Sequence, residues 1–231
     1  MLYLIPNLLA PETHKQVLTP QVYEIVSRLQ YFIVEDTRNA RRFLSSLKIN
    51  IPIDKLSFFE ISKHASLNDL QTAFNLLKNS VEMGLLSEAG CPAIADPGSA
   101  VIAWCHENNI RVVPLVGASS ILLALMASGF NGQNFCFHGY LPIDKNERLQ
   151  KIKVLENAVY QNHQTQIFIE TPFRNNDLLK SILQICKPQT KLCLACNLTA
   201  PDEFIQTQSI NFWQKNSPDL HKKPCVFLLY K

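Results

Sequence analysis

The sequence lacks the short signatures that would assign a binding chemistry directly. It contains no G-x-G-x-x-G fingerprint and no Walker A loop, and its Cys, His, Asp and Glu residues show no metal-binding spacing. Dinucleotide and nucleoside-triphosphate binding are therefore unsupported, and we expect no metal site.

Long apolar runs are also missing. None approaches the roughly 20 residues that a membrane-spanning helix needs. The first 15 residues lack the basic start and the small-residue cleavage site of a signal peptide. We therefore expect a cytoplasmic protein that does not associate with membranes.

Charged residues are few, at 18% of the chain, whereas hydrophobic residues make up 47% of 231 residues. This composition argues against disorder and supplies a sizeable core, enough for two domains. The net charge of +3 permits a nucleic-acid partner but does not require one.

The cysteines do not form a disulfide framework, because there are seven of them without regular spacing. Cys193 and Cys196 form a C-x-x-C pair within an apolar run that reads as a strand. Residues three apart on a strand point to opposite faces. We therefore interpret the cysteines as buried small hydrophobic residues.

Short apolar runs alternate with helical patterns along the chain. We expect strands at 2–5, 31–34, 56–59, 82–86, 111–115, 134–138, 166–169, 191–196, 203–207 and 224–230. We expect helices at 20–29, 40–47, 67–77, 98–107, 120–127, 146–157, 175–186 and 210–215. This order predicts an α/β protein with a mostly parallel sheet in an N-terminal domain, 1–115, and a mixed sheet in a C-terminal domain, 116–231, each with flanking helices.

All seven glycines lie between Gly84 and Gly139. Such clustering is consistent with ligand loops and equally with ordinary turns. One loop in this region, residues 87–98, follows an apolar strand, and Asp96 and Pro97 suit the N-cap and first position of a following helix. This loop either binds a polar ligand or simply connects a strand to a helix.

A second segment places charged residues directly after a strand. Glu35 and Asp36 follow one strand, and Arg38, Arg41 and Arg42 then share one helical face. Such a face suits a phosphate or a carboxylate ligand, although a solvated helix capped by Asp36 would also explain it.

Glu170 ends a later strand, with Arg174 in the first turn of the next helix, where the helix dipole disfavours a cation. Ser119 or Ser120 caps another helix after a strand. A serine-hydrolase elbow is not supported there, because Ile121 replaces the second glycine of G-x-S-x-G. His64 is a further candidate base.

Together these segments resemble one family in order along most of the chain. Residues 87–98, SEAGCPAIADPG, are similar to its S-D-A-G-x-P-x-I-x-D-P-G loop. The remaining similar segments are 2–6 (LYLIP), 35–38 (EDTR), 41–44 (RRFL), 111–119 (RVVPLVGAS), 137–142 (FHGYLP), 170–174 (ETPFR) and 197–199 (NLT). The family is the 16S ribosomal RNA ribose 2′-O-methyltransferases, within the tetrapyrrole (corrin and porphyrin) methylase superfamily.

The resemblance implies two α/β domains, S-adenosyl-L-methionine held in the cleft between them, and usually a homodimer. It also implies a set of cofactor-binding residues: Pro6, Gly90, Cys91, Pro92, Ile94, Ser119, Ser120, Glu170, Cys196 and Asn197. The chain departs from the family in its first loop, which is shortened and lacks a glycine after Pro6, and in Glu88, which replaces an aspartate. With the chain ending at Lys231, the family's additional C-terminal segment is expected to be absent.

The expected reaction is methylation of a ribose hydroxyl in ribosomal RNA. Asp36 or Glu35 would act as the base that removes the hydroxyl proton, and Arg38 would position an anionic substrate. Two alternatives remain open: methylation of a tetrapyrrole or another small molecule, and a protein that binds the cofactor without catalysis.

Overall fold

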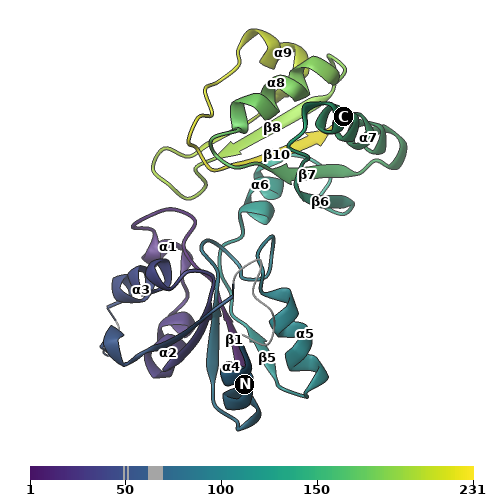
Figure 1. Ribbon diagram of the computed structural model, residues 1–231. Coiled ribbons are helices and arrows are strands. Elements are labelled where there is room, and N and C mark those ends of the chain that lie inside the picture. The colour runs from purple at the N-terminus through teal and green to yellow at the C-terminus, as the bar shows by residue number, and fades with distance from the viewer. Residues whose placement is uncertain (49, 51, 62–69) are drawn as a thin grey trace. The chain divides into compact units, whose positions relative to one another are not determined.

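The computed structural model describes residues 1–48, 50, 52–61 and 70–231, which form two compact units, Met1–Ser119 and Ser120–Lys231 (Figure 1). The division between the units falls after Ser119, and the domain boundary expected after residue 115 stays a prediction. His64 and the start of the helix expected at 67–77 lie outside the described residues.

The first unit contains a five-stranded sheet in which every strand pair is parallel, with the order β3-β2-β4-β1-β5. Its elements are β1 (Leu2–Ile5), α1 (His14–Val17), α2 (Pro20–Arg28), β2 (Tyr31–Val34), α3 (Thr37–Ser46), the 3-10 helix η1 (Ile53–Lys55), β3 (Ser57–Glu60), α4 (Gln71–Lys78), β4 (Met83–Leu86), α5 (Ser99–Glu107) and β5 (Val112–Pro114).

Alternating residues of these strands are buried in two different cores. Ile5 packs in the core on the side of α2 and α3, whereas Leu2 packs in the core on the side of α4 and α5. Because helices cover both faces, the strands are apolar on both sides and read as continuous hydrophobic runs. Parallel pairing places the carboxyl ends of all five strands at one edge of the sheet.

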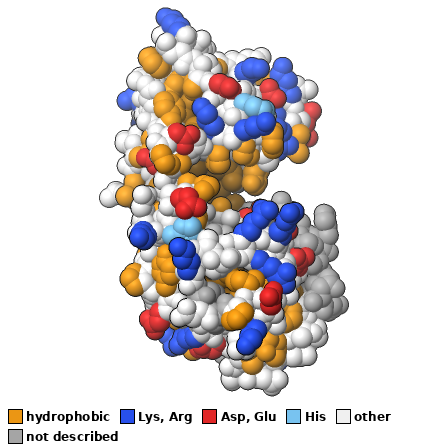
Figure 2. All heavy atoms as spheres, turned by 90° about the vertical axis from the view of Figure 1, so that its left-hand side faces the viewer, with side chains coloured by type: hydrophobic (Ala, Val, Ile, Leu, Met, Phe, Trp, Pro, Cys, Tyr) orange, Lys and Arg blue, Asp and Glu red, His pale blue; other side chains and the backbone are white. Residues whose placement is uncertain are grey.

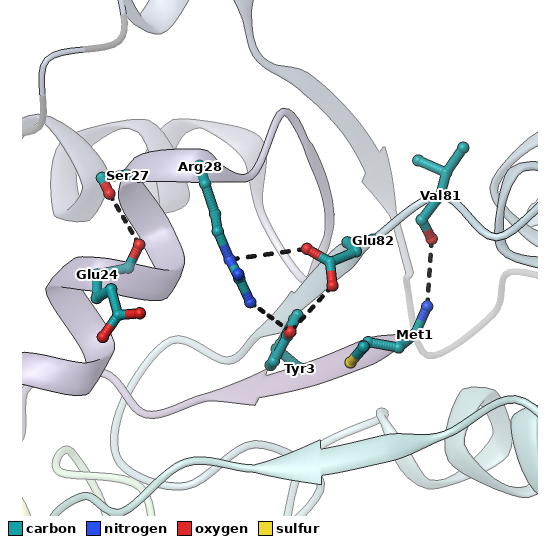
Figure 3. Close-up of polar contacts among 7 residues, drawn as sticks. All are labelled: Met1, Tyr3, Glu24, Ser27, Arg28, Val81 and Glu82. Carbon is teal, nitrogen blue, oxygen red and sulfur yellow. Dashed lines mark hydrogen bonds and ion pairs between the residues drawn. The ribbon is translucent and has the colours of Figure 1, made fainter.

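A polar network stabilises the amino end of this sheet (Figure 3). The Arg28 guanidinium donates a hydrogen bond to the Tyr3 hydroxyl at 2.5 Å, and that hydroxyl donates to Glu82 Oε1 at 3.1 Å. The Met1 amino group donates to the Val81 carbonyl. These contacts join α2 to the first residues of β1 and to the segment that enters β4.

The second unit contains a mixed sheet with the order β6-β7-β10-β8-β9, in which only the β6–β7 pair is parallel. Its elements are α6 (Ser120–Ser128), β6 (Phe135–Tyr140), α7 (Lys145–Asn162), β7 (Thr165–Ile169), α8 (Asn175–Ile185), β8 (Lys191–Cys196), β9 (Phe204–Ser209), α9 (Ile210–Lys215) and β10 (Cys225–Tyr230). The expected α/β class, with one parallel and one mixed sheet, is confirmed.

The two faces of the mixed sheet carry different helices. Cys196 lies in the core that packs against α7 and α8, and Cys193 does not. Thr207, the strand partner of Cys193, donates a hydrogen bond to the Ser128 carbonyl at the end of α6. Cys193 and Cys196 therefore point to opposite faces, as their spacing predicted, and both are buried free thiols.

Most expected elements are present with boundaries shifted by a few residues, but one predicted helix cap is wrong. Asp96 does not cap α5, which begins at Ser99 with Gly98 as its N-cap. The loop before α5 is not yet helical at Asp96. Ala93 and Ala95 have positive φ angles, and the Gly98 N–H donates a hydrogen bond to the Asp96 carbonyl. The short helix α1 had no counterpart among the expected elements.

None of the described helices has the length and apolar character needed to cross a bilayer. Among the same residues, no group of three or more His, Cys, Asp and Glu side chains is arranged to hold a metal ion.

Candidate functional site

The loops that follow β1 and β5 touch at the carboxyl edge of the parallel sheet. Pro6 comes directly after β1, and Gly117 lies three residues after the end of β5. A Cβ atom built on Gly117 would lie 2.1 Å from the Cβ of Pro6, which is far inside van der Waals contact. Gly117 therefore permits this close approach, and it brings the neighbouring Ser119 segment toward the end of β1.

The loop after β4 joins the same group. Gly90 has a φ of +68°, and a Cβ there would lie 3.5 Å from the Ala118 carbonyl oxygen. The Cys91 thiol donates to that same carbonyl at 3.5 Å. Among the residues proposed for cofactor binding, Pro6, Gly90 and Cys91 are thus brought together beside the chain that leads to Ser119.

The remainder of this loop is less enclosed. Pro92 is buried, whereas the Ile94 side chain is 51% exposed. Ala93 and Ala95 adopt left-handed φ angles of 65° and 66°, an arrangement that costs energy for residues other than glycine. Such local strain is commonest where a loop is shaped for function.

Asn7 was not singled out from the sequence, yet its buried amide connects the first loop to the loop after β4. Its Nδ2 donates to the carbonyls of Ser87 and Glu88 at 2.9 and 3.1 Å, and its backbone N–H donates to the Gly90 carbonyl at 2.8 Å. The only local signal was its position two residues beyond the end of a strand.

The acidic–arginine segment begins α3 beside these loops. Asp36 is the N-cap, and its Oδ1 accepts a hydrogen bond from the Asn39 N–H at 2.7 Å. The Asn39 side chain donates to Glu88 Oε1 at 2.9 Å, which joins α3 to the loop after β4. Glu35, directly after β2, is half-buried.

Arg38, Arg41 and Arg42 are all exposed, as expected for one outward helix face. Arg41 lies over the Phe58 ring, 5.4 Å from its centroid. Figure 2 shows Lys and Arg side chains in several small groups on the visible face, interspersed with acidic and hydrophobic ones. Because they are exposed, the three α3 arginines can offer positive charge to an anionic ligand.

In the second unit, Glu170, Cys196 and Asn197 lie at one end of the mixed sheet. Ile169, at the end of β7, pairs with Val226 of β10, and Cys196, at the end of β8, pairs with Cys225. The carboxyl ends of β7 and β8 thus flank the start of β10.

Glu170 is the most unusual polar residue at this end. Its side chain is 1% exposed, and Oε1 accepts hydrogen bonds from the Thr171 N–H and from two nitrogens of the Arg174 guanidinium, at 2.6 to 3.1 Å. Arg174 is the N-cap of α8, where the helix dipole disfavours a positive charge. The ion pair with Glu170 explains why an arginine is nevertheless found there. Among the described residues, no donor meets Glu170 Oε2, which is also buried.

A cavity of about 220 Å³ opens beside Cys196 and Asn197. The Asn197 side chain donates to Asp202 Oδ2 at 2.7 Å, and its φ angle is +51°. The other lining residues come from the turn before β9, from the first residue of β9 and from the segment before β10: Asp202, Phe204, Pro218, Asp219, Leu220 and Lys223.

Comparison with known proteins places the chain among RNA-modifying enzymes. No family model matches it. Ribosomal RNA small subunit methyltransferase I of Haemophilus influenzae is 31% identical over 232 residues, which cover 99% of this chain and 78% of the relative. The proteins of the same name from Helicobacter pylori and Escherichia coli O157:H7 are 34% and 28% identical, and the alignments cover 81% and 99% of this chain and 68% and 77% of the relatives.

Solved structures with the same fold are tetrapyrrole methylases. The methyltransferase CobJ aligns with a TM-score of 0.65 at 16% identity, covering all of this chain and 93% of that one. Uroporphyrin-III C-methyltransferase from Thermus thermophilus, in complex with S-adenosyl homocysteine, aligns with a TM-score of 0.61 at 13% identity, covering 100% and 97%. The fold is thus that of the tetrapyrrole methylases, and the identity and coverage of its sequence relatives show that this chain belongs to the ribosomal RNA small subunit methyltransferase I family.

Proposed function

We propose that the protein transfers a methyl group from S-adenosyl-L-methionine to a ribose 2′-hydroxyl of small-subunit ribosomal RNA. Its membership of the family supports the reaction class and the RNA substrate. The structural observation behind the proposal is the meeting of Pro6, Gly90 and Gly117 at the carboxyl edge of the parallel sheet, since ligands of open α/β sheets bind at that edge.

The environment of Glu170 indicates whether the residues of the proposed site suit this cofactor. A buried carboxylate oxygen without a donor is costly, because it loses its hydration without a replacement. S-adenosylmethionine carries hydroxyl and amino donors that could satisfy such an oxygen. The hydrogen-bond donors of the cofactor therefore suit Glu170, and we propose that Oε2 accepts a hydrogen bond from one of them.

The other proposed cofactor ligands come from the loops described above. In the first unit they are Pro6, Gly90, Cys91, Pro92, Ile94 and Ser119, and in the second unit they are Ser120, Cys196 and Asn197. When bound, S-adenosylmethionine supplies a methyl group activated on a sulfonium. The protein must mainly align the acceptor and exclude water.

The acceptor hydroxyl must lose its proton, and we assign this step to a carboxylate after β2. Asp36 and Glu35 are the candidates. Asp36 Oδ1 is held by the Asn39 N–H, so the proton would have to go to its other oxygen, Oδ2. Arg38, exposed on the first turn of α3, is proposed to bind an RNA phosphate next to the reacting ribose.

We further propose that the protein acts as a cytoplasmic homodimer. The family resemblance supports the dimer, and access to ribosomal RNA supports the location. Sedimentation equilibrium of the purified protein tests the dimer: a mass near twice the chain's 26.2 kDa is expected, and a single-chain mass contradicts it.

Methyl transfer is tested with radiolabelled S-adenosylmethionine, offered separately with small ribosomal subunits, purified ribosomal RNA and a cellular small-molecule fraction. We expect label in RNA, in a nucleotide that resists alkaline hydrolysis because its 2′-oxygen is blocked. Label only in small molecules would support a tetrapyrrole-type acceptor instead. Cofactor binding without label in any fraction would indicate a non-catalytic binding protein.

A further inference from the structure

We propose that Asn7 is the positioning residue of the loop that carries Gly90 and Cys91, and that its side-chain amide sets the affinity for the cofactor. This inference rests on the proposed function, because it names the residue that shapes part of the same site. Asn7 lies in the shortened first loop, where the chain departs from the family pattern.

The contacts of Asn7 are complete and directional. Nδ2 donates to two consecutive carbonyls, Ser87 at 2.9 Å and Glu88 at 3.1 Å, while Oδ1 accepts from the Leu8 N–H at 2.7 Å. The residue is 8% exposed. Because Oδ1 faces a backbone donor and Nδ2 faces two acceptors, the orientation of the amide is determined by its surroundings.

These bonds act on the loop where it leaves β4. Ser87 and Glu88 are the first residues after the strand, and the Asn7 backbone N–H then reaches the Gly90 carbonyl at 2.8 Å. The chain from 87 to 90 is therefore held at three carbonyls by one residue. Leu9 adds an apolar contact, since its Cδ2 lies 3.2 Å from where a Cβ of Gly90 would be.

A second support reaches the same segment from α3, through the Asn39 side chain and Glu88 Oε1. That contact involves exposed side chains, whereas Asn7 is buried and its bond to the Ser87 carbonyl is buried as well. A buried carbonyl that loses its donor is left unsatisfied, so the loop would shift to find another partner. Gly90 and Cys91 would move with it.

No other residue type reproduces this pattern at the same size. Aspartate keeps the acceptor for the Leu8 N–H but turns a negative oxygen toward two carbonyls. Alanine removes all three side-chain bonds. Asn7→Asp is therefore the sharpest test, because it changes one atom and preserves the volume.

The experiment measures S-adenosylmethionine and S-adenosylhomocysteine binding by calorimetry, together with kcat and KM for the full-length chain. In Asn7→Asp we expect Kd and the cofactor KM to rise by about ten- to a hundred-fold, since losing buried hydrogen bonds has effects of this size. We expect kcat at saturating cofactor to change much less. Asn7→Ala should raise Kd in the same direction.

Asn131→Asp is the matched control. Asn131 also donates through Nδ2 to a backbone carbonyl, that of His163, and accepts a backbone N–H, that of Gln133, but it lies between α6 and β6. The Kd of Asn131→Asp for both cofactor forms should equal that of the wild type.

Two outcomes separate this inference from the proposed function. If the wild type binds neither cofactor form, the proposed function fails. If the wild type binds and both folded Asn7 variants bind equally well, the positioning role is overturned while the proposed function stands. Should Asn7→Asp unfold, Asn7→Ala decides the question, with Kd referred to the folded fraction.

Discussion

The Glu170 carboxylate and the Arg174 guanidinium form a one-sided ion pair: two guanidinium nitrogens meet Oε1, at 3.1 and 2.6 Å, and neither meets Oε2. An arginine that faced both oxygens would neutralise the carboxylate more evenly. Here one oxygen is held in place, whereas the other is buried and meets no donor among the described residues. This asymmetry suits a residue that binds a donor supplied by a ligand.

Replacing Glu170 with glutamine should weaken cofactor binding more than it weakens the fold. The amide oxygen can still accept from Arg174, but an NH₂ group then stands where a ligand donor is expected. We predict a rise in the S-adenosylmethionine Kd of about tenfold or more, measured by calorimetry, because a donor faces a donor. Glu147→Gln, on the exposed surface of α7, should leave Kd unchanged. Unaltered affinity in Glu170→Gln would remove Glu170 from the ligand set.

Asp36 has a structural role that must be separated from a catalytic one. Asp36→Ala removes the N-cap of α3 and should cost about 0.5–2 kcal/mol of unfolding free energy. Asp36→Asn keeps a capping oxygen and should leave stability nearly unchanged. If Asp36 is the base, the asparagine variant should still lose about 10²–10⁴-fold in kcat. Urea unfolding and turnover on RNA measure the two effects. Full turnover in Asp36→Asn would exclude Asp36 and leave Glu35.

Gly117→Ala should disturb the meeting of the β1 and β5 loops. The added methyl group would lie 2.1 Å from the Pro6 Cβ, so one of the two backbones must move. We expect a loss of about 1–3 kcal/mol in unfolding free energy, typical of an overpacked site. In Gly132→Ala nothing lies within 4 Å of the new methyl group, so this variant should behave like the wild type in the same urea titration.

Cysteine alkylation offers a map of ligand contact. Burial raises the pKa of the Cys105 and Cys193 thiols to about 11, so neither should react with iodoacetamide at pH 8. Cys91 and Cys136 are only partly buried and should react, although partial burial also raises the pKa of the Cys91 thiol and should slow its reaction. We predict that S-adenosylmethionine slows labelling of Cys91 and not of Cys136, as followed by mass spectrometry of tryptic peptides. Equal rates with and without cofactor would contradict the placement of Cys91.

Glu60 should make a small pH-dependent contribution to stability. Hydrogen bonds from the Thr37 side chain and backbone N–H lower the pKa of this carboxyl from its ordinary value of 4.5. A lowered folded-state pKa means that the stabilisation is present above about pH 4.5 and is lost as the pH falls through the folded-state value. The urea midpoint of the wild type should therefore fall more steeply below pH 4.5 than that of Glu60→Gln. Parallel curves for the two proteins would show that Glu60 contributes nothing.

Local patterns in the sequence predicted most of the helices and strands of the fold. The strands β1, β2 and β8 coincide with the apolar runs from which they were expected, because a strand buried on both faces shows as a continuous hydrophobic run. The helix α2 begins at Pro20, whose ring is suited to a first helical turn. Asp36 caps α3 as its position suggested. The spacing of Cys193 and Cys196 correctly separated them onto two faces.

Tertiary structure alone decided which polar groups meet. Asn7 and Ser87 are 80 positions apart, and no local pattern indicates that one amide will hold the other's carbonyl. The same applies to Gly117 and Pro6. The lack of a side chain at Gly117 matters only because two loops that are distant in the sequence are in contact there. Asp96 shows the converse: its local signal for a helix cap is good, but the left-handed turns at Ala93 and Ala95 delay the helix to Ser99. Periodicity records burial along one segment, whereas a site depends on the relative placement of several segments, which only the packed chain provides.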